Sequence, residues 1–494
     1  MMIKIIYGPV TCRIEGSGKE FRDLSRALDA ELSFWVSGFI FSPKYQSGLW
    51  DGKHHLYSKT THTFPSGLLF KVLNICREEN WEVEVEGYPE PFENVFDSVE
   101  LMGGVQLRDY QLDPIRKILK YHRGVWEVAT NGGKTETAAG LLKLLGHPPC
   151  IFLIPRQVLL RQTADRLKER LGKHVSMMGA GKQEFDPNGI NVCMFQTLQK
   201  KLKNKAFKKS LASIKVVFAD ECHLLLGDGY QTCFESIPAE YRVGMSGTPF
   251  HDDILKKSIM LGLVGPVVGK VDNAELMNMG YSVRPSVAVL DLNIHVDTKS
   301  AEYGDSAWRT SLETHPLRNE VISKMARGLE ESGRQTIVMV ATVEHGSRLS
   351  AMLPKAMFVH ANSPGRKEAV EKLARGDIFT LICTPIFDTG LSVDHIEGLI
   401  LASGGESHIK LLQSIGRAIR VSKTKQKDVW VLDFTDKFNK ITASHARKRK
   451  KVCINQKAFN MVLDWAEIPA EICKYLNGTE LKSKKRSTSP RLPM

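Results

Sequence analysis

The sequence predicts an α/β protein in which a small α/β domain precedes two successive lobes, each built on a parallel sheet. Short, continuously apolar runs rich in β-branched residues alternate with helical segments, which is the pattern of parallel strands covered on both faces. This alternation occurs twice along the chain. The length agrees with the pattern, because 494 residues correspond to about three domains at roughly 150 residues each.

The composition is that of an ordinary globular protein. Hydrophobic residues make up 42% and charged residues 25%, which excludes extensive disorder. No apolar run approaches the ~18 to 20 residues that span a bilayer, and the first ten residues lack the apolar core of a signal peptide. Nine cysteines without a CxxC pair indicate reduced thiols. We therefore expect a soluble, cytoplasmic protein with no membrane partner.

The small α/β domain is expected over residues 1–95. Strand-like and helical patterns are mixed there, and an acidic, proline-containing stretch, Gly87–Glu100, follows as a predicted linker. The predicted strands are Ile3–Tyr7 and Glu82–Glu86, and the predicted helices are Phe21–Leu32 and Leu68–Glu79.

The two lobes are expected over residues 105–270 and 275–440, and a basic extension with a disordered end over residues 441–494. Each lobe supplies five apolar runs of strand length. In the first lobe these are Val125–Ala129, Ile151–Ile154, Val192–Phe195, Val216–Ala219 and Val243–Ser246. In the second they are Thr336–Val340, Ala356–Val359, Thr380–Cys383, Gly398–Leu401 and Val429–Asp433.

A glycine-rich loop follows the first strand of lobe one. It reads Thr130-Asn131-Gly132-Gly133-Lys134-Thr135 and leads into a helical segment, Glu136–Leu145. Glycines let backbone N–H groups surround phosphate oxygens, and the helix N-terminus adds its positive end. Lys134 is expected to reach the β- and γ-phosphates of ATP, and the Thr135 hydroxyl to bind Mg²⁺. Val128 stands where the strict pattern has its first glycine.

Two carboxylates follow the apolar run Val216–Ala219. Asp220 at a strand end suits a second Mg²⁺ contact, and Glu221 suits a base that orients and deprotonates the attacking water. The alternative is that Asp220 only caps the next helix. Cys222 and His223 come next, but two adjacent residues without other ligands nearby do not indicate a metal site.

Two arginines stand near the end of the second lobe, in Gln413-Ser414-Ile415-Gly416-Arg417-Ala418-Ile419-Arg420. A separation of three residues places Arg417 and Arg420 on one helix face. Together with the phosphate-binding loop, they are expected to contact the γ-phosphate and to neutralise transition-state charge. The alternative is a surface pair held in salt bridges.

These segments, in this order, resemble the superfamily 2 helicases and translocases over about residues 105–435. The resemblance implies two RecA-like lobes that hydrolyse ATP with Mg²⁺ and move along nucleic acid. The matching segments are Leu107–Gln111, Ala129–Thr135 (motif I), Asp220–His223 (the DExH box), Ser246–Thr248 (motif III), Thr384–Asp394 (motif V) and Gln413–Arg420 (motif VI).

The resemblance also assigns roles to single residues. It implies that Gln111 reads adenine, that Gly390 contacts the nucleotide, and that Gln413 acts with the two arginines of motif VI. Motif V departs from the family, because Ser392 stands where an aspartate is common. The nucleotide contact of that aspartate is therefore not carried over, and Asp388 and Asp394 are not assigned to it.

The N-terminal segment resembles the accessory domain of the UvsW-type phage helicases. The matching stretches are Phe39-Ile40-Phe41-Ser42-Pro43-Lys44, Gly48-Leu49-Trp50-Asp51-Gly52-Lys53 and Phe64-Pro65-Ser66-Gly67-Leu68. The resemblance implies action on branched DNA: Holliday junction migration and fork regression, in the host cytoplasm if a phage encodes the protein. Lys44 and Lys53 are candidates for phosphate contacts. Phe41 and Trp50 are expected either in the domain core or against bases.

The net charge also points to a polyanion. There are 68 Lys and Arg against 55 Asp and Glu, a net charge of +13. Residues 441–494 contribute +8 of it, from 12 basic and 4 acidic residues, with basic runs at Ala446–Lys451 and Lys482–Arg486. We expect this extension to contact DNA phosphates. The lysine-rich run Lys200–Lys209 is either a solvated surface or a further phosphate contact.

Four other functions fit parts of the pattern. A DNA-translocating subunit of a restriction or repair complex and an RNA helicase share the motor motifs. A viral packaging motor shares the phosphate loop but has a nuclease domain in place of the second lobe, and a non-enzymatic DNA-binding scaffold would not hydrolyse ATP. The favoured prediction is a DNA helicase of recombination, replication or repair, with DNA and proteins of those processes as partners.

Overall fold

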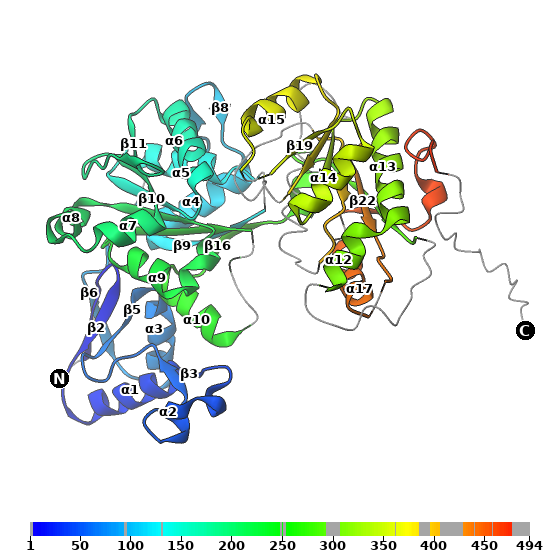
Figure 1. Ribbon diagram of the computed structural model, residues 1–494. Helices are drawn as coiled ribbons and strands as arrows, with labels where there is room; N and C mark the ends of the chain where they lie inside the picture. The colour runs from blue at the N-terminus through cyan, green and yellow to red at the C-terminus, as the bar shows by residue number, and fades with distance from the viewer. Residues whose placement is uncertain are drawn as a thin grey trace, which may run out of the picture. The chain divides into compact units, whose positions relative to one another are not determined.

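The computed structural model divides into two compact units, Met1–Asp272 and Asn273–Met494 (Figure 1). The unit boundary lies between the two lobes expected from the sequence. Among the described residues, no helix is long and apolar enough to cross a membrane. The structure describes residues 3–92, 96–129, 132–247, 249, 253–292, 307–360, 362–384, 396–405, 428–438, 440–456 and 458–476.

The N-terminal domain is a four-stranded mixed sheet with two helices, which confirms the small α/β fold. The strand order is β5-β2-β1-β6; β1 runs antiparallel to β2 and parallel to β6. Apolar side chains of the sheet and of α1 and α3 form its core. The strands of the sheet and the helices beside it are, in chain order, β1 (Ile3–Ile6), β2 (Thr11–Glu15), α1 (Gly18–Glu31), β5 (Thr63–Pro65), the 3-10 helix η2 (Ser66–Leu68), α3 (Leu69–Glu78) and β6 (Val83–Glu86).

A separate hairpin projects from this sheet between α1 and β5. Its strands pair antiparallel, and the loop between them holds one 3-10 helix and one short α-helix. The elements are β3 (Ser33–Trp35), η1 (Phe39–Phe41), α2 (Pro43–Gln46) and β4 (Lys53–His55).

The first lobe contains an eight-stranded sheet that is parallel except for the edge strand β12. The strand order is β12-β11-β13-β10-β14-β15-β9-β16, and two clusters of buried apolar side chains make the core. Its strands are β9 (Arg123–Val128), β10 (Cys150–Ile154), β11 (Val175–Gly179), β12 (Lys182–Gln183), β13 (Ile190–Met194), β14 (Val216–Asp220), β15 (Tyr241–Ser246) and β16 (Val267–Val271). Its helices are α4 (Asp109–Tyr121), α5 (Lys134–Leu144), α6 (Gln157–Leu171), α7 (Phe195–Lys201), α8 (Lys205–Ser210), η3 (Leu211–Ser213), η4 (Cys222–Leu226), α9 (Asp228–Glu235) and α10 (Ile254–Leu263).

The N-terminal domain packs directly against this lobe. Arg123, at the start of β9, donates through Nη2 to the hydroxyl of Tyr7 at 3.0 Å and to the carbonyl of Pro9 at 2.7 Å. At Gly67 an added Cβ would lie 2.0 Å from the carbonyl oxygen of Leu261, so only glycine allows this approach between η2 and α10. The accessory domain and the first lobe therefore form one unit.

The predicted linker is packed rather than loose. Within it, Tyr88 contacts the ring of Tyr7 edge-on at 4.9 Å and donates to the carbonyl of Tyr121 at 3.3 Å. The linker ends in a two-stranded hairpin of β7 (Glu100–Leu101) and β8 (Val105–Gln106). Acidic residues and prolines indicated a linker, but the apolar residues between them are enough to dock this stretch on the lobe.

The second unit contains a seven-stranded sheet in which every described pairing is parallel. The order is β19-β20-β18-β21-β22-β17-β23, and apolar clusters again form the core. All ten strands predicted for the two lobes are thus present. The strands of this unit are β17 (Ser286–Leu290), β18 (Thr336–Met339), β19 (Met357–Val359), β20 (Thr380–Cys383), β21 (Gly398–Leu401), β22 (Trp430–Phe434) and β23 (Asn460–Val462). Its helices are α11 (Asn273–Asn278), α12 (Ala307–Thr314), α13 (Pro316–Glu331), α14 (Val343–Met352), α15 (Arg366–Arg375), α17 (Lys440–Asn455) and η6 (Trp465–Glu467).

The boundary expected after residue 440 cuts through this unit. Strand β23 pairs with β17, and an added Cβ at Gly328 of α13 would lie 2.1 Å from the carbonyl oxygen of Ile472. The first part of the basic extension, as far as residue 476, is therefore integrated in the second sheet and its helices. The physical reason is that α17 carries buried residues among its basic ones, Arg449 included.

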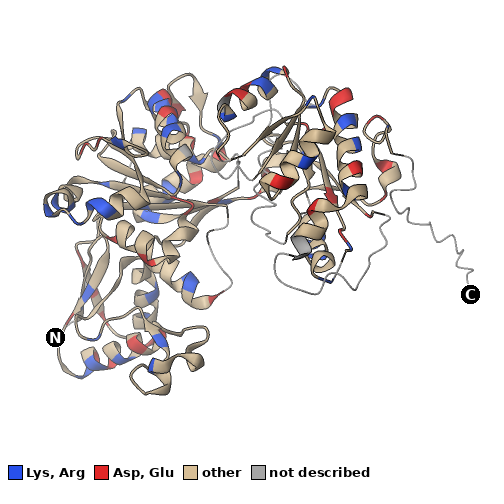
Figure 2. Ribbon diagram, in the orientation of Figure 1, with Lys and Arg blue, Asp and Glu red and all other residues tan. Residues whose placement is uncertain are grey.

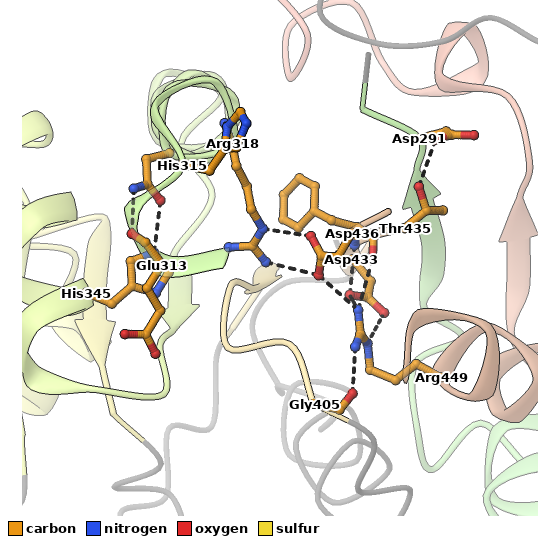
Figure 3. A network of polar contacts seen from close by, with 12 residues as sticks. Asp291, Glu313, His315, Arg318, His345, Gly405, Asp433, Thr435, Asp436 and Arg449 are labelled. Atoms are coloured by element: carbon orange, nitrogen blue, oxygen red, sulfur yellow. Dashed lines mark hydrogen bonds and ion pairs between the residues drawn. The ribbon is translucent and has the colours of Figure 1, made fainter. Parts of the chain in front are cut away.

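Arg449 belongs to a buried network of charged groups (Figure 3). Its Nε donates to Asp433 at 2.8 Å and its Nη1 to the carbonyl of Gly405 at 2.6 Å. Arg318 of α13 donates through Nε to Asp436 at 2.7 Å, and Nη2 of Arg449 reaches the same carboxylate at 3.4 Å. Two arginines and two aspartates thus neutralise one another, and the helix α17 is fixed to the end of β22.

Candidate active site

The candidate site lies at the carboxyl edge of the lobe-one sheet. Strands β9 and β14 both pair with β15, one on each side and in parallel. The registers Glu127–Ser246 and Asp220–Met245 place the ends of the three strands at one level. Loops that follow parallel strands meet at this edge, where ligands bind in open α/β sheets. The phosphate-loop segment and the DExH segment therefore come from strands that are separated only by β15.

The described part of the glycine-rich loop has the conformation that a phosphate-binding loop requires. Gly133 is left-handed with φ of 75°, and α5 begins at the next residue, Lys134. The amide of Gly132 donates to the carbonyl of Ala129 at 3.1 Å and tightens the turn. The first amides of a helix have no partner within the helix, so those of α5 are available to an anion. Thr135 lies in this first turn, half-buried.

Gln111 is buried against this loop. Its Nε2 donates to the carbonyls of Gly132 and Gly133, both at 3.3 Å, and its Oε1 accepts from the amide of Arg108 at 2.9 Å. A Cβ on Gly133 would lie 2.2 Å from Nε2 of Gln111, so the glycine also makes room for this side chain. The structure thus brings the residue expected to read adenine into contact with the phosphate loop.

Tyr110 is a site residue to which the sequence analysis gave no role. Its hydroxyl donates to the carbonyl of Gly132 at 3.2 Å and accepts from Nη1 of Arg108 at 2.8 Å. Its position directly before Gln111 in a matched segment was the available signal. The start of α4 therefore supports the loop through two side chains.

The carboxyl group of Asp220 lies at the end of β14 and is partly buried. Burial raises its pKa to about 6 even though the ammonium of Lys134 lowers it, and the Glu221 carboxylate adds to the rise. Among the described residues Asp220 accepts one hydrogen bond, from the amide of Glu221 at 3.1 Å. The alternative that Asp220 caps the following helix is wrong, because Glu221 takes the N-cap position of η4 and no side-chain cap is formed there.

Glu221 is held in a left-handed conformation with φ of 50°, which is uncommon for a residue with a side chain. Its Oε2 accepts from the hydroxyl of Ser246 at 3.4 Å and lies 3.4 Å from Nδ1 of His223. The same Nδ1 lies 3.1 Å from the Ser246 hydroxyl. The DExH segment and the first residue of motif III are therefore joined in one polar cluster. Backbone strain of this kind often marks functional positions.

The residues present fit a nucleotide with Mg²⁺. The partly buried carboxylate of Asp220, which has unused oxygen acceptors among the described residues, lies close enough to Lys134 for their charges to interact. A hydroxyl that suits Mg²⁺, that of Thr135, follows Lys134 at the helix start. Hard oxygen ligands of this type, next to a lysine and free helix amides, match a triphosphate and its metal ion. The pair Cys222 and His223 does not make a metal site, because Cys222 is buried in the apolar core and His223 bonds to Ser246.

Several predicted site residues lie outside the described residues. In lobe one these are Thr130, Asn131 and Thr248; in the second unit they are Gly390 and Ser392 of motif V and Gln413, Arg417 and Arg420 of motif VI. The roles assigned to them remain predictions from the sequence. The same holds for the basic run Lys482–Arg486 and the expected disordered end.

The lysine-rich run of lobe one lies on α7 and α8 (Figure 2). Five of its six lysines are exposed, and none of the six forms an ion pair with another residue that the structure describes. Uncompensated lysines of this kind suit contact with phosphates, but a solvated surface has the same geometry, so both interpretations stay open.

The N-terminal candidates differ in their exposure. The side chain of Phe41 is 78% exposed, so its expected alternative place in the core is wrong. Trp50 is half-buried, and its Nε1 donates to the carbonyl of Lys53 at 2.8 Å. Lys44 is exposed, and the ammonium of Lys53 lies 4.9 Å from the ring centre of Trp35.

Three protein families match this chain in sequence. Residues 14–86 match "DNA helicase UvsW, N-terminal", residues 104–251 match "Type III restriction enzyme, res subunit", and residues 317–422 match "Helicase conserved C-terminal domain". The matches follow one another in the order of the accessory domain and the two lobes.

Two relatives are similar over most of their length. The chain is 24% identical over 459 residues to "ATP-dependent DNA helicase uvsW" of Enterobacteria phage T4, covering 86% of this chain and 89% of the relative. It is 23% identical over 447 residues to "DNA 3'-5' translocase XPB2" of Sulfurisphaera tokodaii, covering 82% of this chain and 96% of the relative.

Two solved structures share the fold at low sequence identity. The type ISP restriction-modification enzyme LlaBIII bound to DNA aligns with a TM-score of 0.54 and 14% identity, over 74% of this chain and 32% of that one. Dbp5 of S. cerevisiae bound to RNA and ADP–BeF₃ aligns with a TM-score of 0.51 and 13% identity, over 74% of this chain and 93% of that one. The ordered motifs, the parallel sheets and the three family matches together identify the chain as an ATP-hydrolysing superfamily 2 DExH-box helicase that resembles the UvsW-type phage helicases.

Proposed function

We propose that the protein is an ATP-dependent DNA helicase or translocase that acts on branched DNA, migrating Holliday junctions and regressing stalled forks in recombination, replication or repair. The observation that carries this proposal is the UvsW N-terminal match at residues 14–86, ahead of both motor matches in one chain. The phage relative with the same layout is named a DNA helicase, and its similarity extends over 89% of its length.

We assign the nucleotide chemistry to residues at the carboxyl edge of the lobe-one sheet. Lys134 contacts the β- and γ-phosphates, Thr135 and Asp220 hold Mg²⁺, and Glu221 orients the attacking water and accepts its proton. A bound Mg²⁺ ion supplies positive charge that stabilises the transferred phosphoryl group. The contacts between Glu221, His223 and Ser246 support this assignment, because they fix the carboxylate of the base relative to motif III.

The remaining roles rest on the sequence motifs. Gln111 recognises adenine, and Gly132 and Gly133 surround the phosphates together with Thr130 and Asn131. Gln413, Arg417 and Arg420 act on the γ-phosphate, with Gly390 as a further nucleotide contact. Because these groups favour the triphosphate over the diphosphate, hydrolysis removes affinity at each cycle, and that difference drives movement along the DNA backbone.

The ATPase assignment is tested with Lys134→Ala and a matched control, Lys143→Ala. Both lysines lie on α5, one at its start and one exposed in its last turn. We expect DNA-stimulated ATP hydrolysis to be lost in the first variant and to be retained in the second. Normal turnover of the Lys134 variant would refute the assignment of the site.

The substrate assignment is tested by ATP-dependent remodelling of a synthetic four-way junction beside a simple tailed duplex. Faster processing of the junction is the expected result. Activity on the tailed duplex alone would contradict branch migration and leave a general helicase. An RNA duplex in a third reaction tests the remaining alternative.

A second candidate is translocation along duplex DNA without strand separation. It is favoured by the similarity to a relative that is named a translocase and is matched over 96% of its length. Displacement of a third strand from a triplex, without unwinding of the duplex beneath it, would distinguish this activity from helicase action.

A further inference from the structure

The hairpin loop of the N-terminal domain presents an unusual cluster of exposed apolar side chains. We define the apical loop as residues 36–52, which join β3 to β4. The described residues include 13 exposed large hydrophobic side chains, and four of them lie within the 15 residues from Trp35 to Leu49. These four are Trp35, Ile40, Phe41 and Leu49. Single exposed apolar residues are common, but a contiguous group usually marks a binding surface.

The apical loop is held in shape by contacts of its own. The ring of Phe39 stacks on Trp35 at 4.5 Å and meets Tyr45 edge-on at 4.8 Å. Gly52 is left-handed with φ of 81°, and a Cβ there would lie 2.6 Å from the Phe39 ring. The core of the N-terminal domain takes no residue from 36–52. The loop therefore has a small aromatic base, and its apolar apex is exposed from an ordered scaffold.

Phe41 and Leu49 are the most exposed members of the cluster. Their exposed fractions are 78% and 82%. Phe41 contacts no other aromatic ring among the described residues, whereas one face of Trp35 is stacked on Phe39 and its ring also lies under the ammonium of Lys53. We call Ile40, Phe41 and Leu49, the exposed apolar residues of the loop that remain available to a partner, its apex. Figure 1 shows α2, within this loop, at the end of the N-terminal domain remote from the lobe-one sheet.

The charges beside the apex are positive. Lys44 is exposed and has no ion pair among the described residues, and the ammonium of Lys53 lies over the Trp35 ring and interacts electrostatically with the Asp51 carboxylate. The single carboxylate of the loop, Asp51, accepts from the amide of Lys53 at 3.0 Å and from Nε2 of His55 at 2.9 Å. Asp51 offsets part of the charge of Lys53, so Lys44 is the uncompensated cation that an approaching anion meets, with Lys53 beside it. Apolar side chains flanked by lysines suit a ligand with flat apolar faces and anionic edges.

We propose that the apex of the apical loop packs against the exposed face of a base pair at a branch point of DNA, with Lys44 and Lys53 on the flanking phosphates. The proposal rests on the proposed function and adds the feature that selects branched DNA. A continuous duplex hides its base faces by stacking, whereas a junction or a duplex end exposes them. Apolar side chains inserted at base steps and aromatic rings stacked on bases are both established modes of nucleic-acid contact.

The test uses the full-length protein and measures its affinity for two DNAs of equal length, a four-way junction and a continuous circular duplex without ends. Phe41→Ala combined with Leu49→Ala should weaken junction binding about tenfold or more, the usual loss when a stacking side chain is removed, and leave duplex binding unchanged. Phe41→Trp should retain most of the wild-type affinity for the junction, since tryptophan keeps an aromatic face at this position. Met102→Ala, an exposed apolar residue elsewhere in the same unit, is the control and should change neither.

Lys44→Ala gives a separate readout. It should weaken binding of the junction more than binding of the circular duplex, and reduce the salt dependence of junction binding by about one phosphate contact. Unchanged junction affinity in the double variant would overturn the proposal. A double variant that instead loses self-association or adsorption to anionic vesicles would overturn it in favour of a protein or membrane partner.

Failure of the inference is distinguishable from failure of the proposed function. If the wild-type protein hydrolyses ATP in response to DNA but the double variant binds junctions normally, only the role of the apical loop is wrong. If DNA does not stimulate the wild-type ATPase at all, the proposed function itself fails.

Discussion

The buried charges around Arg449 give a stability prediction of definite size (Figure 3). Arg449→Ala leaves the carboxylates of Asp433 and Asp436 with one arginine between them, in a place where both are 1% exposed. The carbonyls of Gly405 and Phe434 lose their donor as well. Breaking a buried ion pair from one side costs about 3 to 5 kcal/mol. For a unit of this size, that lowers the unfolding midpoint by about 6 to 20 °C.

The assay is calorimetric unfolding of the full chain, with hydrogen exchange of the β22 amides as a readout confined to the second unit. Arg447→Ala is the matched control, because Arg447 is an exposed arginine two residues earlier on the same helix. Arg449→Lys should give an intermediate loss, since an ammonium group cannot reproduce the fork of contacts that the guanidinium makes. Equal stability of the two alanine variants would refute the reasoning.

Three further predictions concern the candidate site and the second lobe. Because the pKa of Asp220 in the folded state is raised to about 6, the metal-free protein should lose stability as pH rises from about 4 to 6. Asp220→Asn should abolish this loss and be more stable than the wild type at pH 8, by up to about 3 kcal/mol. Denaturant titrations in the presence of a chelator measure the difference. Gly133→Ala should impair ATP hydrolysis, since its Cβ would displace Gln111; a double-mutant cycle with Gln111→Ala should show a coupling of about 0.5 to 3 kcal/mol, and strict additivity would contradict it. Burial lowers the pKa of His345 to about 3, with Arg318 adding to the effect, so stability should fall as pH decreases below about 6.5, and His345→Gln should remove that part of the pH dependence.

The sequence was sufficient for the parts of the fold that depend on local pattern. The apolar runs of the parallel strands and the glycines of the phosphate loop are recognisable because a few consecutive residues determine them. Gly133 is an instance: both its left-handed φ and the helix that begins after it follow from the Gly-Lys-Thr sequence. Strands such as β2 and β23 were missed because they are short and carry charged or polar residues, so only their partners in the sheet make them strands.

The basic extension shows why charge alone is a poor guide to whether a segment is exposed or buried. A run such as Ala446–Lys451 indicates an exposed surface, and four of its five basic residues are not fully buried. The residues buried in this part of α17 are Ala446, Arg449 and Cys453, which recur at the spacing of one helix face. That spacing can be read from the sequence. The burial of Arg449 depends on its partners Asp433 and Asp436, however, and their proximity is known only from the tertiary structure. The +8 charge of residues 441–494 therefore includes one arginine that is committed to the core.

Each lobe has an aspartate at the end of a buried parallel strand, but the two aspartates differ in their ion pairing. Asp433 ends β22 nearly as Asp220 ends β14, and the two are alike in sequence context. Asp433 is paired with Arg449 through two hydrogen bonds, so its charge is compensated within the protein. Among the described residues no arginine pairs with Asp220, and burial raises the pKa of its carboxyl group to about 6 although the charge of Lys134 lowers it. A carboxylate without a direct ion pair gains more from a cation that arrives with a ligand than a carboxylate that is already paired with an arginine. The ion pair, rather than the place at a strand end, thus distinguishes the structural position of Asp433 from the Mg²⁺ position that we propose for Asp220.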